Sequence, residues 1–212
     1  NCVKISGNGP KKVVFMRGQS TQGSESDFFS YVNYLINDED SSFKVTDPFK
    51  SYQDQFSFYG DLKKHDDASF PVYTFIIKGK ERSYFGTINN DGSFKKTVKQ
   101  GSSCFDVADG DSQYVFLFER DFRNVHSAWA EGVGGGLIFM GSNFLPDADS
   151  PKYPYKGSPT FMHEIGHSFA KLYDEYIVAD LPSKFWFNWR GNPTNCSSRP
   201  SKDFRSSVDN RI

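Results

Sequence analysis

The sequence predicts an α+β fold, with a mixed sheet and two main helices, and three observations support this prediction. Short apolar runs of strand length recur along the chain, for example at residues 13–16 and 137–140. Two other segments have the apolar spacing of a helix that buries one face. The order along the chain is strand, helix, several strands, helix. We therefore expect a single domain over residues 1–212, which is long enough to bury a sizeable core.

The elements follow in this order. Residues 11–17 (KKVVFMR) are apolar and β-branched, which favours a first strand. A helix is expected over residues 26–37, because its apolar side chains repeat at intervals of three and four. Further strands are expected at residues 56–60, 70–79, 82–88, 112–120 and 134–141, with a turn at 89–92 and another possible strand at 184–190. A last helix opens at Ser158 as N-cap, with Pro159 at its first position.

Composition excludes some partners. The net charge is −1, so nothing indicates nucleic acid or an anionic membrane as a partner. No apolar run approaches the length of a membrane span.

The cysteines and a glycosylation sequon favour a secreted protein. The chain begins at Asn1 and stops without a closing pattern, so we expect a processed chain or an excerpt of a longer one. Its three cysteines, Cys2, Cys104 and Cys196, allow one disulfide and a free thiol in a secreted protein, or three thiols in a cytosolic one. The glycosylation sequon at residues 195–197 adds a little weight to secretion.

The last predicted helix contains the pattern HExxH at residues 163–167. With 4 His and 7 Glu in 212 residues, a shuffled chain would contain it roughly 0.0025 times. Residues four apart on a helix differ by about 40° and about 6 Å, so the imidazoles of His163 and His167 face the same side. Their nitrogens could then bind one ion at about 2.0–2.1 Å. The pattern therefore predicts that both histidines are zinc ligands.

Glu164 stands beside the first histidine, where it could act on a zinc-bound water. Zinc lowers the pKa of such a water towards about 7 and polarises a substrate carbonyl. Glu164 would take a proton from that water as general base and pass it to the leaving amine. The predicted activity is therefore that of a zinc-dependent endopeptidase. The alternative is a half-buried helix whose two histidines bind no metal.

A catalytic zinc usually has three protein ligands and a water, so a third ligand is needed. The metzincin continuation HExxHxxGxxH fails here, because Ala170 and Tyr173 occupy its last two fixed positions. No glutamate follows Glu175, so a later helix cannot supply one. Asp174 is the leading candidate and Glu175 the close alternative; both could also be solvated acids. On a straight helix Asp174 would lie about 10.5 Å beyond the second histidine, so the helix must end near residues 170–172.

These residues resemble the IgA-peptidase family of zinc metallopeptidases. Residues 163–176 (HEIGHSFAKLYDEY) are similar to the family's HEFGHSFGGLADEY-like stretch. Residues 47–60 are similar to its PFKSYRDRFNVY-like segment, and residues 114–122 and 132–141 resemble its strand and Gly-rich run. The resemblance covers most of residues 12–180.

The resemblance implies a zincin or metzincin-like catalytic domain with Zn²⁺ as cofactor and Asp174 as the third ligand. It also implies a secreted protease that acts on a protein or peptide, with other domains in the parent chain. Ala170 and Lys171 replace two family glycines, and no methionine follows Met162 to form a methionine turn. A catalytically silent zincin-like binding or adhesion module of a larger secreted protein is therefore the alternative function, and a zinc amidase a third.

The glycine-rich run before the last helix and the two remaining histidines have other expected roles. In metzincins a strand before the zinc helix forms the upper rim of the cleft, so by resemblance Gly135, Gly136 and Leu137 would bind substrate backbone by strand addition. The alternative is a glycine-rich strand start or bulge. For His65 and His126 we expect a structural or surface role rather than metal binding.

Overall fold

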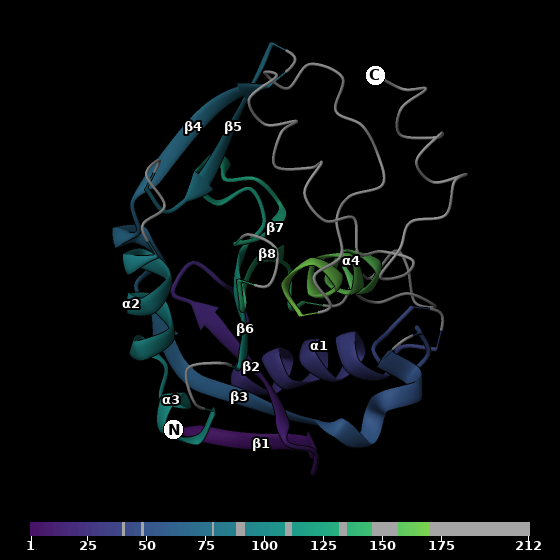
Figure 1. Cartoon of the computed structure of the whole chain (residues 1–212). Helices are drawn as coiled ribbons and strands as arrows, with labels where there is room; N and C mark the ends of the chain where they lie inside the picture. Colours follow the sequence, from purple (N-terminus) through teal and green to yellow (C-terminus); the bar gives the residue numbers. More distant parts are fainter. Residues whose placement is uncertain are drawn as a thin grey trace, which may run out of the picture.

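A six-stranded mixed sheet with helices on both faces forms the centre of the protein (Figure 1). The computed structural model describes residues 1–39, 41–47, 49–77, 79–87, 92–108, 112–131, 135–145 and 157–169. The sheet strands are β1 (Cys2–Gly7), β2 (Lys11–Gly18), β3 (Phe56–His65), β6 (Gln113–Glu119), β7 (Ala128–Ala130) and β8 (Leu137–Ser142). The helices are α1 (Glu25–Asn37), α2 (Ser93–Gly101), α3 (Phe105–Ala108) and α4 (Ser158–Ser168), and β4 (Val72–Ile77) and β5 (Lys80–Phe85) form a separate hairpin. Short 3₁₀ segments lie at Phe49–Gln55, Asp67–Ser69 and Phe122–Asn124. The predicted α+β class with a mixed sheet is confirmed.

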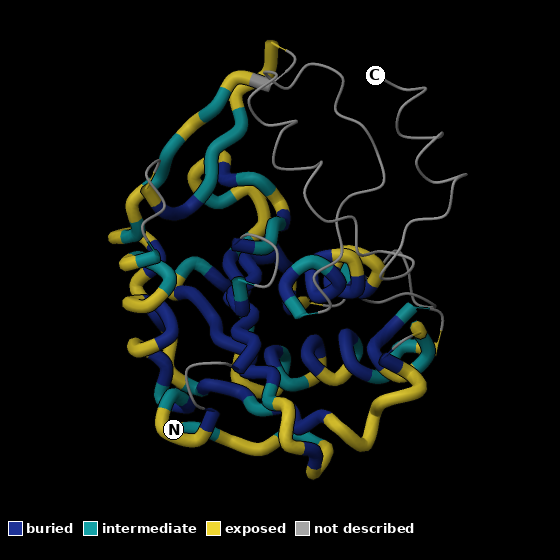
Figure 2. The backbone as a smooth tube through the Cα atoms, viewed as in Figure 1, coloured by how far each residue is buried: buried dark blue, intermediate teal, exposed yellow. Residues whose placement is uncertain are grey.

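The order of strands across the sheet is β1-β3-β2-β6-β8-β7. The four central strands are parallel, and each outer strand is antiparallel to its neighbour. Central strand β2 is buried on both faces, as expected for a parallel strand covered by helices. Its side chains alternate, so that Val13 and Phe15 face α1 and α4 while Val14 and Met16 face α2. Figure 2 shows the central strands in the colour of buried residues.

Helix α1 covers the sheet beside α4 (Figure 1). It starts one residue before the predicted position, because Ser24 and Asp27 form a reciprocal capping box. The predicted apolar face is the buried one, with Phe28, Tyr31 and Val32 among its residues. This helix is the backing helix that the sequence predicts.

The start of α4 differs from the prediction by one residue. Gly157, with φ of +118°, is the N-cap, and Ser158 lies inside the first turn. A Cβ at position 157 would come within 2.8 Å of the Tyr31 hydroxyl, so the tight approach of α1 favours glycine there. The Ser158 hydroxyl is buried and has no hydrogen-bond partner among the described residues.

Four helices and strands were not expected from the sequence. Strand β1 is partly exposed and pairs with β3 among the described strands, and β7 has three residues. Helix α3 has only four residues, and helix α2 begins directly after the predicted turn at 89–92. Its nine residues include only two large apolar side chains, Phe94 and Val98, which are too few to show a helical repeat. Part of the helical content therefore lies outside the two main helices expected from the sequence.

Candidate metal centre

Helix α4 lies against α1, β8 and the edge strand β7 (Figure 1). Its buried face holds Phe161 and Ile165, and the Phe161 ring lies 5.6 Å from that of Phe15 on β2. On β7, Ala128 and Ala130 face the same side as α4. Because both side chains are small, the helix can lie close to the edge of the sheet. The edge strand and the HExxH helix are thus neighbours.

The two histidines of α4 converge. The Nε2 atoms of His163 and His167 are 3.0 Å apart, and the ring planes are nearly perpendicular. Two nitrogens at about 2.05 Å from one ion, with a tetrahedral angle between them, would be about 3.3 Å apart. The observed separation fits a pair of ligands to one metal after a small adjustment. His163 is exposed and His167 half-buried, so an ion could reach both.

Glu164 lies on a different side of the helix and is only 7% exposed. Its charge acts electrostatically on Tyr84 of β5. Burial raises the pKa of Tyr84, the Arg82 guanidinium lowers it, and the Glu164 carboxylate raises it. A buried carboxylate adjacent in sequence to one of two converging histidines could serve as a general base.

Tyr84 belongs to an aromatic cluster between the β4–β5 hairpin and β7, which the sequence analysis missed. Its ring stacks on Tyr73 at 5.6 Å and meets Trp129 edge-on at 5.3 Å. His126 lies 5.4 Å from the same ring, and a ring nitrogen of His126 is 3.3 Å from Arg82. Only the strand pattern of residues 82–88 pointed to this region, because its packing against Trp129 of β7 arises from the fold.

His126 therefore has a packed position, in line with the structural role expected for it. Burial lowers its pKa, and the neighbouring Arg82 lowers it further. Among the described residues, no three His, Cys, Asp or Glu side chains are grouped as a metal site, so His126 does not complete a set with the α4 pair.

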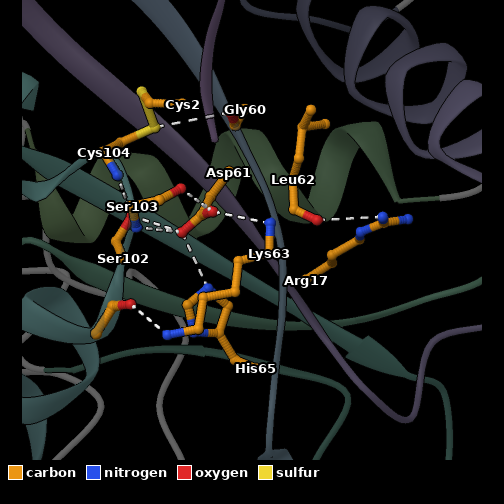
Figure 3. A network of polar contacts seen from close by, with 11 residues as sticks. Cys2, Arg17, Gly60, Asp61, Leu62, Lys63, His65, Ser102, Ser103 and Cys104 are labelled. Atoms are coloured by element: carbon orange, nitrogen blue, oxygen red, sulfur yellow. Dashed lines mark hydrogen bonds and ion pairs between the residues drawn. A yellow bond between two sulfur atoms is a disulfide. The ribbon is translucent and has the colours of Figure 1, made fainter.

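His65 and Asp61 form a second polar group, on β3 near the disulfide (Figure 3). Asp61 is fully buried and 2.9 Å from His65 Nε2. The Ser102 hydroxyl and the Ser103 backbone N–H each donate to it at 2.8 Å. The next residue, Cys104, is bonded to Cys2. This network ties β3, β1 and the loop after α2 together, so His65 has the structural role expected.

The backbone groups of Gly136 and Leu137, where substrate binding by strand addition was expected, already have partners within the protein. Gly136 accepts a hydrogen bond from the Tyr114 N–H at 2.9 Å and donates one to Ser168 at 3.0 Å. The Leu137 carbonyl accepts from the Glu131 N–H at 2.8 Å. Since β8 is paired on both sides, a peptide cannot add to the sheet at Gly136 or Leu137, and Gly135 precedes this paired strand. The sheet edge is one strand further out, at β7.

Both candidates for a third ligand, Asp174 and Glu175, lie outside the described residues. Helix α4 is described as far as Ser168, and the Phe169 N–H donates to the Ile165 carbonyl. The helix end that the sequence predicts near residues 170–172 lies outside the described residues.

No helix among the described residues has the length and apolarity needed to cross a membrane. Comparisons of the chain with protein-family models, curated proteins and solved structures found no match.

Proposed function

We propose that this chain is a zinc-dependent metallopeptidase with a zincin-like catalytic domain related to the IgA-peptidase family. The observation that carries the proposal is the convergence of His163 and His167, whose Nε2 atoms are 3.0 Å apart on the solvent side of α4. The buried carboxylate of Glu164 adds a candidate base next to them. The parallel sheet with one antiparallel edge strand beside α4 supports the same assignment.

In this proposal His163, His167 and Asp174 hold Zn²⁺, which would supply a water of lowered pKa and polarise the scissile carbonyl. Glu164 accepts a proton from the attacking water. The carboxylate then gives that proton to the nitrogen of the leaving amine as the C–N bond breaks. The products are a carboxylate and an amine, and Glu164 returns to its starting state.

The substrate would be an extended peptide that pairs with β7. The Gly141 N–H donates to the Ser127 carbonyl, and the Glu131 N–H donates to the Leu137 carbonyl. In an antiparallel ladder every second pair of facing residues is hydrogen-bonded, so the intervening pair, Trp129 and Phe139, is hydrogen-bonded too. The backbone groups of Ala128 and Ala130 consequently point away from β8. No described strand pairs with them. Strand addition here would place a peptide along the outer edge of β7, the strand that α4 contacts.

Secretion is part of the proposal. The Cys2–Cys104 disulfide joins residues 102 positions apart, and structural disulfides persist mainly in oxidising compartments. A secreted metallopeptidase with further domains in the parent chain is consistent with this bond.

Replacement of Glu164 tests the mechanism. Glu164→Ala and Glu164→Gln should retain zinc but cleave a peptide-library substrate about 10²–10⁴-fold more slowly, because they lack the base. Zinc content is measured by mass spectrometry and cleavage by product analysis. Glu81→Gln, at an exposed residue of the hairpin, is the matched control and should cleave as the parent does. A Glu164 variant as fast as the parent would overturn the mechanism.

The second candidate is a catalytically silent zincin-like binding or adhesion module. It is favoured by Ala170 and Lys171, which stand where the family has glycines. The same assay separates the two functions. A parent protein that binds zinc but cleaves no peptide in the library supports the silent module.

A further inference from the structure

A buried hydroxyl fixes the last turn of α4 to the sheet. The Ser168 hydroxyl donates to Gln113 Oε1 at 2.6 Å and accepts from the Gly136 N–H at 3.0 Å. We propose that Ser168 is a positioning residue, which holds the neighbouring His167 in the orientation that binds metal. This inference rests on the proposed function.

Both partners of Ser168 belong to the middle of the sheet. Gln113 is the first residue of β6, and Gly136 immediately precedes β8, the strand paired with β6. Ser168 is 1% exposed and Gln113 is 8% exposed, so water cannot readily replace either contact. The hydroxyl therefore connects the end of α4 to two adjacent strands at once.

The glycine at position 136 makes this contact possible. Gly136 has φ of +72°, and a Cβ there would come within 2.7 Å of Lys99 Nζ. Lys99 is itself held in place, because its ammonium donates to the Ser112 carbonyl at 3.2 Å. A larger residue would strain the backbone that directs the Gly136 N–H at Ser168. On this account the glycine-rich run anchors the zinc helix, which is a different role from the substrate binding first expected of it.

The anchor acts directly beside the second histidine of α4. His167 is the residue before Ser168, and its Nε2 must stay near that of His163 for both to bind one ion. The Phe169 ring packs 5.0 Å from Phe56 and gives additional, nonpolar support. Loss of partners that orient a metal ligand typically weakens metal affinity 10–100-fold.

The test measures zinc affinity and unfolding separately, by chelator competition on the full chain and by thermal melting of the zinc-free protein. Ser168→Ala should weaken zinc binding about tenfold or more. Ser168→Thr retains the hydroxyl and should restore affinity to within about threefold of the parent. Ser158→Ala is the matched control: it removes a buried hydroxyl of the same helix that has no described partner, and zinc affinity should not change.

A second variant keeps the proposal testable if Ser168→Ala does not fold. Gln113→Met removes the acceptor from the sheet side, leaves α4 unaltered, and should weaken zinc binding several-fold. The anchor is refuted if a folded Ser168→Ala or Gln113→Met variant binds zinc as tightly as the parent. It is also refuted if Ser158→Ala loses as much affinity as Ser168→Ala. Failure of the proposed function looks different, because then the parent itself binds no zinc.

Discussion

At the scale of single residues, Asp61 shows how a buried charge is kept ionised. Burial by itself raises the pKa of this carboxyl group. The hydrogen bonds from His65, Ser103 and Ser102 outweigh burial and hold the pKa well below its ordinary value of 3.8. The folded state therefore binds this proton less readily than the unfolded chain does. It follows that Asp61 stabilises the fold above about pH 4, and that this contribution is lost as the pH falls below that value.

We expect Asp61→Asn to reduce the free energy of unfolding at pH 7 by about 3 kcal/mol, because it removes a buried carboxylate that accepts several hydrogen bonds. The difference from the parent should shrink as the pH is lowered from 4 towards 2. Urea unfolding of the zinc-free protein across this pH range measures both effects. Asp54→Asn, at an exposed residue, should have little effect at any pH. A pH-independent difference for Asp61→Asn would contradict the explanation.

Single residues also mark where sequence reasoning succeeds and where it stops. His163, Glu164 and His167 could be identified because HExxH depends only on helical spacing. Tyr84 could not, since its proximity to Glu164 depends on how the hairpin folds back. The role of Gly136 was likewise hidden, because its partner Ser168 is 32 residues away.

At the scale of elements, strand β7 is the part of the candidate site that the sequence analysis placed elsewhere. Strand addition was expected at the glycine-rich run, but β8 lies inside the sheet and β7 forms its edge. A three-residue strand has too few positions to show an alternating pattern. By contrast α1 was predictable, because thirteen residues give the apolar repeat several turns in which to appear.

The edge of β7 leads to a prediction for substrate binding. Ala130→Pro removes an outward N–H while leaving the bonds between β7 and β8 intact, and proline is tolerated on edge strands. We expect KM for a peptide substrate to rise about tenfold, because one backbone hydrogen bond to the peptide is lost. The melting temperature should change by only a few degrees.

Ala130→Val is the control for added bulk, since it retains the N–H and suits a strand. It should leave KM close to that of the parent. Steady-state kinetics on one cleaved peptide compare the variants. An unchanged KM in Ala130→Pro would show that the substrate does not pair with this edge.

At the scale of the whole molecule, the fold brings distant segments to the β7 edge of the sheet. Helix α4, edge strand β7 and the β4–β5 hairpin carry the histidine pair, the outward backbone groups and the aromatic cluster (Figure 1). The α+β class followed from local patterns. The strand order did not, because pairing between β2 and β6 joins residues about a hundred positions apart. The Cys2–Cys104 bond was one of several pairings that three cysteines allow.

The central claim is that His163 and His167 bind zinc together with Asp174. Metal content by mass spectrometry tests it most directly, on the parent, on the His163→Ala/His167→Ala double variant and on Asp174→Ala. We predict about one zinc per parent chain, none in the double variant and a strong loss in Asp174→Ala. Unchanged zinc in Asp174→Ala would move the third ligand to Glu175 or elsewhere. A parent chain without zinc, or zinc that persists in the double variant, would contradict the claim.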